Sequence, residues 1–381
     1  MSSSRFRGSS RFRRSSGSIR SSTFKRSRIA TCCALAGCIL MLASACSSDT
    51  SSTAKPEQDS SSKDEVVLVT YDAFALPEDA AAEFTKLTGA TIKVVATGDS
   101  STMLTKALLS AGAPEGDVIF GIDNTLATRA LAEDLLQPFQ PKLIEQVPDS
   151  LRLDGKAGEQ LVPIDTGDVC INIDQEWFAN NGIEAPTEMA QLADPTYRDL
   201  LVLASPVTSS PGLAFLIGTI ALSGEDGWLD YWQQLKDNGV RVRPSWDDAY
   251  YSDYTVSGGD RPLVLSYASS PPAEVVFSDP KRTEPASSVM LDTCVAQVEY
   301  AGVLAGAAEP ELGQKLVDFM LSPAWQKALP LSNFVFPVTD VELPEVFEKF
   351  APGATKPLSL DPALISAQRD AWIEQWREKM E

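Results

Sequence analysis

The sequence predicts an α/β protein made of two lobes. Apolar, β-branched runs recur along residues 66–121, and segments with a helical pattern separate them. Strands that alternate with single helices are typical of a parallel sheet with helices on both faces. The length of 381 residues allows two domains of about 150 residues each.

Local signals predict the elements of the first lobe. Residues 66–71 read Val-Val-Leu-Val-Thr-Tyr, which favours a buried strand. Pro77 then begins a helix that Gly89 ends. The next elements are expected to be a strand at 91–96, a helix at 102–111 and a strand at 117–121.

The rest of the chain continues the alternation and shows no internal repeat. Strands are expected at 161–173, 200–204, 263–267 and 295–301, and helices from Gly212 and at 309–321, 323–329 and 361–379. We assign residues 65–165 and about 295–308 to the first lobe. Residues 166–294 and about 309–381 form the second lobe.

The composition excludes several classes of protein. Hydrophobic residues make up 44% of the chain and charged residues 22%, so intrinsic disorder over the whole length is excluded. The chain has no histidine, which removes Ser-His-Asp and Cys-His catalysis and histidine metal sites. We expect neither an enzyme nor a bound cofactor or metal.

The charge is concentrated in two regions of opposite sign. Residues 1–45 contain nine Lys or Arg and no Asp or Glu. Residues 46–381 hold the other 23 basic and all 52 acidic residues, a net charge of −29. A region with this much negative charge repels phosphate backbones, which excludes nucleic acid as a partner. The same charge attracts cationic small ligands.

The amino terminus has the pattern of an export signal. Residues 1–28 are basic and Ser-rich, and residues 29–45 are almost wholly apolar and end in small residues. This order predicts a secretory signal peptide, residues 1–45. A transmembrane anchor is the alternative, although about 17 apolar residues is at the short limit for spanning a bilayer.

Cys46 is the predicted site of a lipid anchor. Ala43-Ser44-Ala45-Cys46 resembles a bacterial lipobox, and the Ser-rich residues that follow, to about residue 64, predict a flexible tether. The sequence before Cys38 also fits the lipobox, but an apolar run follows Cys38 where a tether is expected. We therefore expect a monomer anchored to the outer face of the cell membrane as a lipoprotein.

Two cysteines remain in the body of the protein. Cys170 and Cys294 each lie in a strand-like run and belong to an oxidising compartment. They form either a disulfide between distant segments or two buried free thiols.

Six short segments, in order and spacing, resemble the thiamine-binding proteins of bacterial ABC importers. They are Tyr71-Asp72-Ala73-Phe74, Gly121-Ile122-Asp123-Asn124, Ser209-Ser210-Pro211-Gly212-Leu213, Trp246-Asp247-Asp248-Ala249-Tyr250, residues 265–271 and residues 367–373. The resemblance runs from about residue 66 to 381. It implies a periplasmic-binding-protein type II-like fold, in which hinge strands join two α/β lobes and the ligand binds in the cleft between them. It also implies thiamine or its phosphates as ligand, and an ABC permease and ATPase as partners.

The resemblance also implies the ligand-binding residues. Position by position, the pocket of the family falls on Asp99, Ser100, Ser209, Ser210, Trp246 and the run Tyr267, Ala268, Ser269 and Ser270, with Tyr71 and Phe334 at further aromatic positions. Phe334 stands where the resembled proteins carry a tryptophan.

Elementary chemistry favours the same kinds of residue. Thiamine joins a cationic thiazolium to an aminopyrimidine, and aromatic faces attract cations and stack on flat rings. A carboxylate would balance the charge and accept from the amine, for which Asp99, Asp123 and Asp168 are candidates. Asp123 could instead cap a helix. Ser209-Ser210-Pro211 begins a helix, whose free amides could donate hydrogen bonds to a phosphate oxygen, or the serines could be a plain cap.

Two other functions are compatible with parts of the sequence. Adjacent tyrosines ligate iron in related binding proteins, and Tyr250-Tyr251 is such a pair, so a ferric iron or small-cation binder is the alternative. A secreted hydrolase that uses paired carboxylates is a more distant one.

Overall fold

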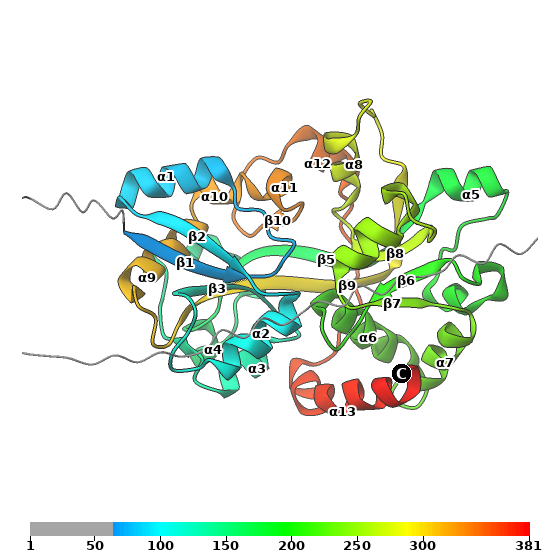
Figure 1. Cartoon of the computed structure of the whole chain (residues 1–381), viewed down its shortest axis with the longest axis horizontal. Helices are drawn as coiled ribbons and strands as arrows, with labels where there is room; N and C mark the ends of the chain where they lie inside the picture. Colours follow the sequence, from blue (N-terminus) through cyan, green and yellow to red (C-terminus); the bar gives the residue numbers. More distant parts are fainter. Residues whose placement is uncertain (1–63) are drawn as a thin grey trace, which may run out of the picture. The chain divides into compact units, whose positions relative to one another are not determined.

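The computed structural model describes residues 64–381, which form a mixed α/β sheet with helices on both faces (Figure 1). The predicted signal peptide, Cys46 and nearly all of the tether lie outside the described residues. The strands are β1 (Glu65–Thr70), β2 (Thr91–Ala96), β3 (Val118–Asp123), β4 (Leu136–Gln137), β5 (Val162–Asp174), β6 (Leu201–Ala204), β7 (Arg241–Arg243), β8 (Leu263–Tyr267), β9 (Ser287–Leu304) and β10 (Phe336–Pro337).

Thirteen α-helices are present in the described residues. They are α1 (Glu78–Thr88), α2 (Ser100–Leu109), α3 (Ala127–Ala132), α4 (Gly155–Gly158), α5 (Gln175–Asn181), α6 (Ser210–Ser223), α7 (Trp228–Asp237), α8 (Pro271–Phe277), α9 (Pro310–Met320), α10 (Pro323–Gln326), α11 (Leu329–Ser332), α12 (Glu345–Phe350) and α13 (Pro362–Met380). A short π-helix, η5 (Asp248–Asp253), follows β7.

The strands lie in the order β2-β1-β3-β9-β5-β8-β6-β7, with β4 and β10 at the side of β9 and β5. The first half of the sheet, β1 to β3, is parallel, as the alternation of strands and helices predicts. The second half, β6 to β8, is also parallel. Strands β9 and β5 pair antiparallel with each other and with both halves, so the sheet is mixed rather than parallel throughout.

Two long strands connect the halves of the sheet (Figure 1). Strand β5 has 13 residues and β9 has 18, so β9 is much longer than the predicted strand at 295–301. Two of the predicted lobe boundaries, those after residues 165 and 294, fall within these strands, and the one at about 308 lies just after β9. Helix α9 contacts β1 and β3, although the predicted boundaries place residues 309–381 in the second lobe. The lobe boundaries themselves stay a prediction.

The ends of the helices follow the predicted signals. Helix α1 begins after Pro77 and ends at Gly89, which adopts φ 81° and donates its amide to the carbonyl of Thr85. A residue with a Cβ would be strained in this left-handed conformation, which explains why the helix stops there. Helix α2 begins two residues earlier than expected, because the side chain of Asp99 accepts from the amide of Ser100.

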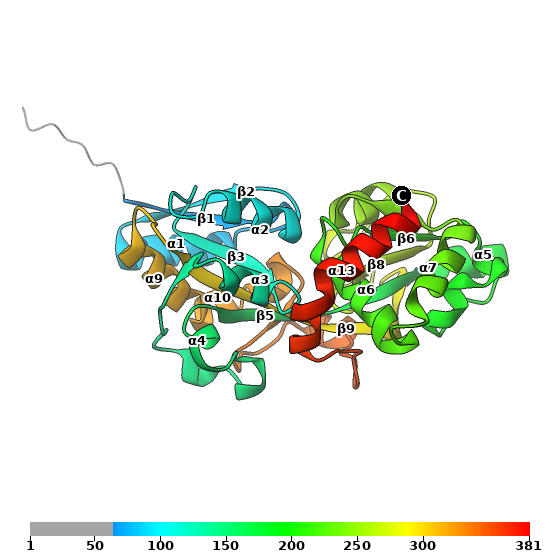
Figure 2. The same ribbon diagram turned by 90° about the horizontal axis from the view of Figure 1, so that it is seen from below.

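The terminal helix packs on the second half of the sheet. Figure 2 shows α13 lying beside α6 and α7. The ring of Trp376 in α13 meets Trp232 of α7 edge-on at 5.6 Å, and the indole N–H of Trp232 donates to Thr219 of α6. Because these groups are buried, they hold the three helices together as one layer.

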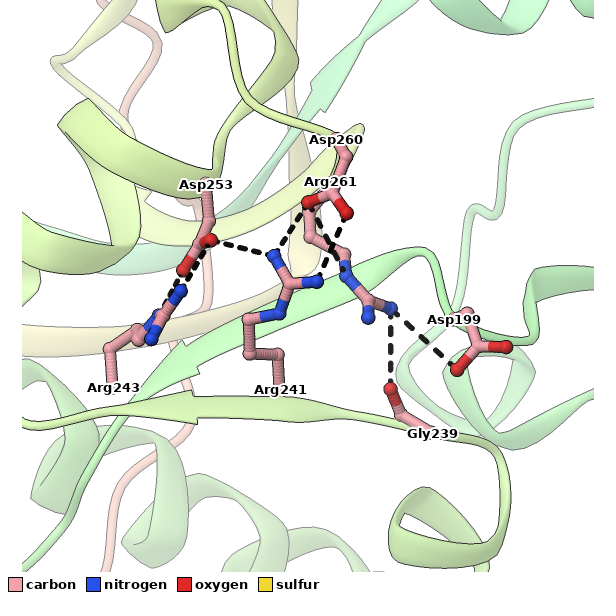
Figure 3. A network of polar contacts seen from close by, with 7 residues as sticks. All are labelled: Asp199, Gly239, Arg241, Arg243, Asp253, Asp260 and Arg261. Atoms are coloured by element: carbon pink, nitrogen blue, oxygen red, sulfur yellow. Dashed lines mark hydrogen bonds and ion pairs between the residues drawn. The ribbon is translucent and has the colours of Figure 1, made fainter. Parts of the chain in front are cut away.

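A network of arginines and aspartates holds the segment after β7 (Figure 3). Asp253 at the end of η5 accepts hydrogen bonds from both Arg241 and Arg243 of β7, and Arg241 also pairs with Asp260. The side chain of Asp253 is only 5% exposed, and its hydrogen bond with Arg243 is the main reason that its pKa is lowered. Residues 244–252 are thereby held at both ends.

Cys170 of β5 and Cys294 of β9 form a disulfide between the two long strands. Both residues are fully buried. In residues 64–381, no helix is both long and apolar enough to cross a membrane.

Candidate functional site

A cleft of about 940 Å³ opens between the two halves of the sheet. Its wall includes the loop after β1, the start of α2, the loop after β7, the end of β8, strand β9 and the loop after α11. Helix α8 and the loop after it, to Arg282, also contribute. The volume is near the upper end of the range for pockets that hold small organic ligands.

Seven of the predicted binding residues line this cleft. They are Tyr71, Asp99, Ser100, Trp246, Tyr267, Ser270 and Phe334. Five others, Asp123, Ser209, Ser210, Ala268 and Ser269, are buried and lie outside the wall of the cleft. Asp168 lies outside the wall too, and its carboxylate accepts from the amide of Ala354 at 2.9 Å.

Aromatic rings form one side of the cleft. Trp246 stacks on Tyr250 with a centroid distance of 4.9 Å, and it meets Tyr267 edge-on at 6.1 Å. The indole N–H of Trp246 donates to the hydroxyl of Ser266 at 3.1 Å, which fixes the orientation of the ring. This arrangement presents flat, electron-rich faces to a ligand.

Phe334 lies at another part of the wall in an unusual backbone conformation. Its φ is 55°, which is rare for a bulky side chain. The preceding residue, Asn333, exchanges two hydrogen bonds with the backbone of Ala75, at 2.9 and 3.0 Å. These bonds hold the loop against the first half of the sheet, and Phe334 meets the exposed ring of Phe277 at 5.5 Å. Backbone strain of this kind persists where neighbouring contacts fix the position.

Asp99 connects the two halves of the sheet. Its carboxylate accepts from the amide of Ser100 at 2.7 Å in the first half, and from the amides of Trp246 at 3.0 Å and Ser210 at 3.4 Å in the second half. Burial raises its pKa to about 6, and these hydrogen bonds oppose that rise. The amide of Ser210, which we expected to be free for a phosphate, is therefore already bonded to a carboxylate.

Three buried carboxyl groups lie in one row across the centre of the sheet. Glu299 of β9 stands directly opposite Asp123 of β3 on one side and Asp165 of β5 on the other. Asp123 accepts from the amides of Thr125 and Leu126 and from the side chain of Gln297, which is the capping arrangement considered as an alternative. Tyr71 donates its hydroxyl to Glu299 at 3.1 Å.

These carboxyl groups have no basic partner. Within residues 64–381, no ion pair involves Asp99, Asp123, Asp165 or Glu299. Burial and the nearby charge of Asp123 raise the pKa of Glu299 to about 8. Burial and the charge of Glu299 raise the pKa of Asp165 well above its usual value. Buried charges are costly unless they are paired, so the site favours a positively charged occupant.

The sequence interpretation did not select Glu299 or Asp165 as site residues. One signal could have found Glu299, since a lone acidic residue interrupts the apolar pattern of the predicted strand 295–301. A charged residue in the middle of a buried strand usually has a specific partner.

Tyr250 and Tyr251 both line the cleft, yet they differ strongly in environment. Tyr250 is buried against Trp246, whereas Tyr251 is 62% exposed. Burial raises the pKa of Tyr250, which opposes the phenolate form that ferric iron requires. In the described part of the chain, no cluster of three or more acidic or cysteine side chains has the geometry of a metal site.

Comparison with known proteins places the chain in a family. Residues 114–357 match the family model described as bacterial extracellular solute-binding protein. The thiamine-binding periplasmic protein of Escherichia coli (strain K12) is 31% identical over 287 residues, which cover 75% of this chain and 83% of that protein. The chain belongs to the bacterial extracellular solute-binding proteins.

Other members of this solute-binding family support the same assignment. The thiamine-binding periplasmic protein of Salmonella typhimurium (strain LT2) is 30% identical over 320 residues, covering 82% of this chain and 92% of that protein. A solved structure titled periplasmic thiamin binding protein superposes with a TM-score of 0.73 at 28% identity, covering 83% of this chain and 96% of that chain. The predicted type II binding-protein fold is thus confirmed. Members of the family are extracytoplasmic binding components of ABC transport and not enzymes.

Proposed function

We propose that this solute-binding protein captures thiamine or a thiamine phosphate outside the cytoplasmic membrane and delivers it to an ABC permease. The two curated relatives described above are named thiamine-binding periplasmic proteins, and seven residues implied by the resemblance line one cleft. The cleft has room for a ligand of this size.

One observation supports this ligand most strongly. Buried carboxyl groups without basic partners lie beside the aromatic rings of Trp246 and Tyr267 in the same cleft. A thiazolium has a permanent positive charge and a flat aromatic face, so it can satisfy both kinds of group at once. A neutral sugar or an anion has no positive charge with which to stabilise the ionised form of these carboxyl groups.

Capture is coupled to closure of the cleft. Asp99 belongs to the first half of the sheet, and its carboxylate accepts hydrogen bonds from backbone amides of the second half. A ligand that contacts both halves favours the closed form by its differential affinity for the two forms. The closed form is then the one that docks on the permease. We further propose that Cys46 anchors the protein to the membrane, with the signal peptide removed.

Calorimetric titration of the purified protein tests the ligand. We expect saturable binding of thiamine, and titrations with the monophosphate and diphosphate will rank the vitamers. Ferric iron, the alternative ligand, is titrated in the same way. Its binding through Tyr250 and Tyr251 would produce a visible charge-transfer band. Binding of iron without binding of any thiamine form would overturn the proposal.

A further inference from the structure

Asp165 and Glu299 form a carboxyl pair at the inner end of the cleft. They stand directly opposite each other on the antiparallel strands β5 and β9. Side chains in that position share one face of a sheet and lie within contact distance. Glu299 is part of the cleft wall, whereas Asp165 is 1% exposed and lies outside the wall.

The pair has little else to stabilise its charge. Tyr71 donates one hydrogen bond to Glu299. Among the described residues, the Asp165 carboxyl group has no hydrogen-bond partner other than the carboxyl group of Glu299. Two adjacent buried carboxyl groups cannot both be ionised without a large cost, so at least one of the two keeps its proton whether or not the cleft is occupied.

The surroundings favour retention of a proton on the other carboxyl group as well when the cleft is empty. The titratable groups that face the pair are Tyr71 after β1, Asp99 before α2, Asp123 of β3 and Tyr267 of β8. All four are acids, and none supplies a positive charge. Strand β10 places Pro337 opposite Asp165, which adds no charge either.

We propose that Asp165 and Glu299 are both protonated in the empty cleft and that Glu299 loses its proton when a cationic ring binds, so that ligand capture releases a proton. The O–H bond of the Glu299 carboxyl group breaks and its proton passes to water, while Asp165 keeps its proton. The pair then carries a single negative charge, which balances the single positive charge of the ligand. This inference rests on the proposed function, because it requires a permanently cationic ligand.

The proposal fixes the direction of the pH dependence. Burial raises the pKa of Glu299 to about 8 in the empty protein. A bound cation favours the ionised form and lowers that pKa. Between the two pKa values, binding must displace a proton, so affinity increases as pH rises toward about 8, by at most about tenfold per pH unit.

Calorimetry in two buffers of different ionisation enthalpy counts the protons directly. The purified protein is titrated with thiamine near pH 7 in each buffer, and the difference in the measured heats gives the number released. We expect release of a large fraction of one proton, and a Kd that falls at least about threefold from pH 6 to pH 8. The charge of the thiazolium does not change with pH, so the dependence of affinity on pH comes from the protein and from the aminopyrimidine of the ligand. The aminopyrimidine contributes equally to titrations of the wild type and of the variants below.

Two variants distinguish the pair from other carboxyl groups. Glu299→Gln keeps the shape but cannot hold the proton, so it should lose the proton release and the slope of affinity with pH. Asp168→Asn is the matched control, because Asp168 lies on the same strand as Asp165 and outside the wall of the cleft. It should retain both properties.

The outcomes separate the two proposals. Thiamine binding by the wild type with no proton release would overturn the proton-linked mechanism and leave the proposed function standing. No thiamine binding at any pH would overturn the proposed function. If Glu299→Gln fails to fold, the proton count in the wild type still decides the question.

Discussion

At the scale of single residues, Trp246 is the clearest candidate for a ligand contact. Its ring is stacked on Tyr250, and its indole and amide are fixed by Ser266 and Asp99. A ring held in place before binding loses little conformational entropy when the ligand arrives. The aromatic wall therefore belongs to the free protein as well as to the complex.

Replacing Trp246 by alanine should weaken thiamine binding by more than about tenfold, because it removes the face on which a cationic ring stacks. Thermal unfolding should change little, since the ring is only partly buried. Titration calorimetry measures the first effect and a melting curve the second. Trp246→Phe is the control that keeps an aromatic face. Equal affinity in the alanine variant and the wild type would remove Trp246 from the site.

Glu299 should make the ligand-free protein less stable as pH rises. Its pKa in the folded protein is raised from 4.5 to about 8, so the folded state retains a proton that the unfolded chain loses. The free energy of unfolding therefore falls between about pH 5 and pH 8 and levels off above that.

Urea unfolding of wild type and Glu299→Gln at both ends of this range tests that linkage. The glutamine variant should gain stability relative to the wild type as pH rises from about 5 to about 8. A stability difference that is the same at both pH values would show that Glu299 does not retain a proton in the folded state.

At the scale of elements, the segment between β7 and the end of η5 determines where Trp246 lies. Arg243 precedes this segment and Asp253 ends it, and the two side chains are bonded to each other. Since Arg241 also bonds to Asp253, the π-helix is attached to the sheet at one buried carboxylate (Figure 3).

Asp253→Ala should destabilise the protein by about 1–3 kcal/mol, because it leaves both arginines without their buried partner. It should also weaken thiamine binding, because residues 244–252 lose one anchor. Denaturant unfolding and calorimetry measure the two effects. Asp260→Asn is the matched control, since Asp260 is an exposed partner of Arg241 and should matter little. Wild-type affinity in Asp253→Ala would show that the network does not position Trp246.

The elements predicted from the sequence are those with strong local signals. Strands β1 to β3 have continuous β-branched runs, and the helix between β1 and β2 has a proline start and a glycine stop. The full length of β9 was not predictable in this way, because its first residues, 287–294, are mixed in polarity and are fixed by pairing with β5. One helix was expected at 323–329, whereas the structure has α10 there and a second short helix, α11, that begins at Leu329.

The residues of the candidate site also divide into those that the sequence identifies and those that only the fold brings together. Trp246 and Tyr267 could be selected because they lie in segments that resemble the thiamine-binding family and because thiamine needs aromatic faces. Asp165 and Glu299 are 134 positions apart, and only the pairing of β5 with β9 brings them together. Such a pair cannot be identified from the spacing of residues along one sequence.

At the scale of the whole molecule, the two halves of the sheet meet around the cleft and are joined by β5 and β9. Asp99 bonds across the cleft to Trp246 and Ser210, which favours a closed arrangement. Opening must break these hydrogen bonds, so the ligand and Asp99 act on the same equilibrium.

Thiamine should shift this equilibrium toward the closed form. Small-angle X-ray scattering of the purified protein should show a smaller radius of gyration on saturation with thiamine, because the ligand contacts both halves. Asp99→Ala should have a larger radius than the wild type before ligand is added. An unchanged radius in both comparisons would indicate that the cleft does not close on its ligand.

The central claim is that the cleft selects a flat, positively charged ring. Comparing the affinities of thiamine and of thiochrome, its uncharged oxidised derivative, in parallel calorimetric titrations tests this claim most directly. The account predicts that thiamine binds at least about tenfold more tightly, because only the cation balances the buried carboxyl groups. Equal or tighter binding of the uncharged compound would contradict it.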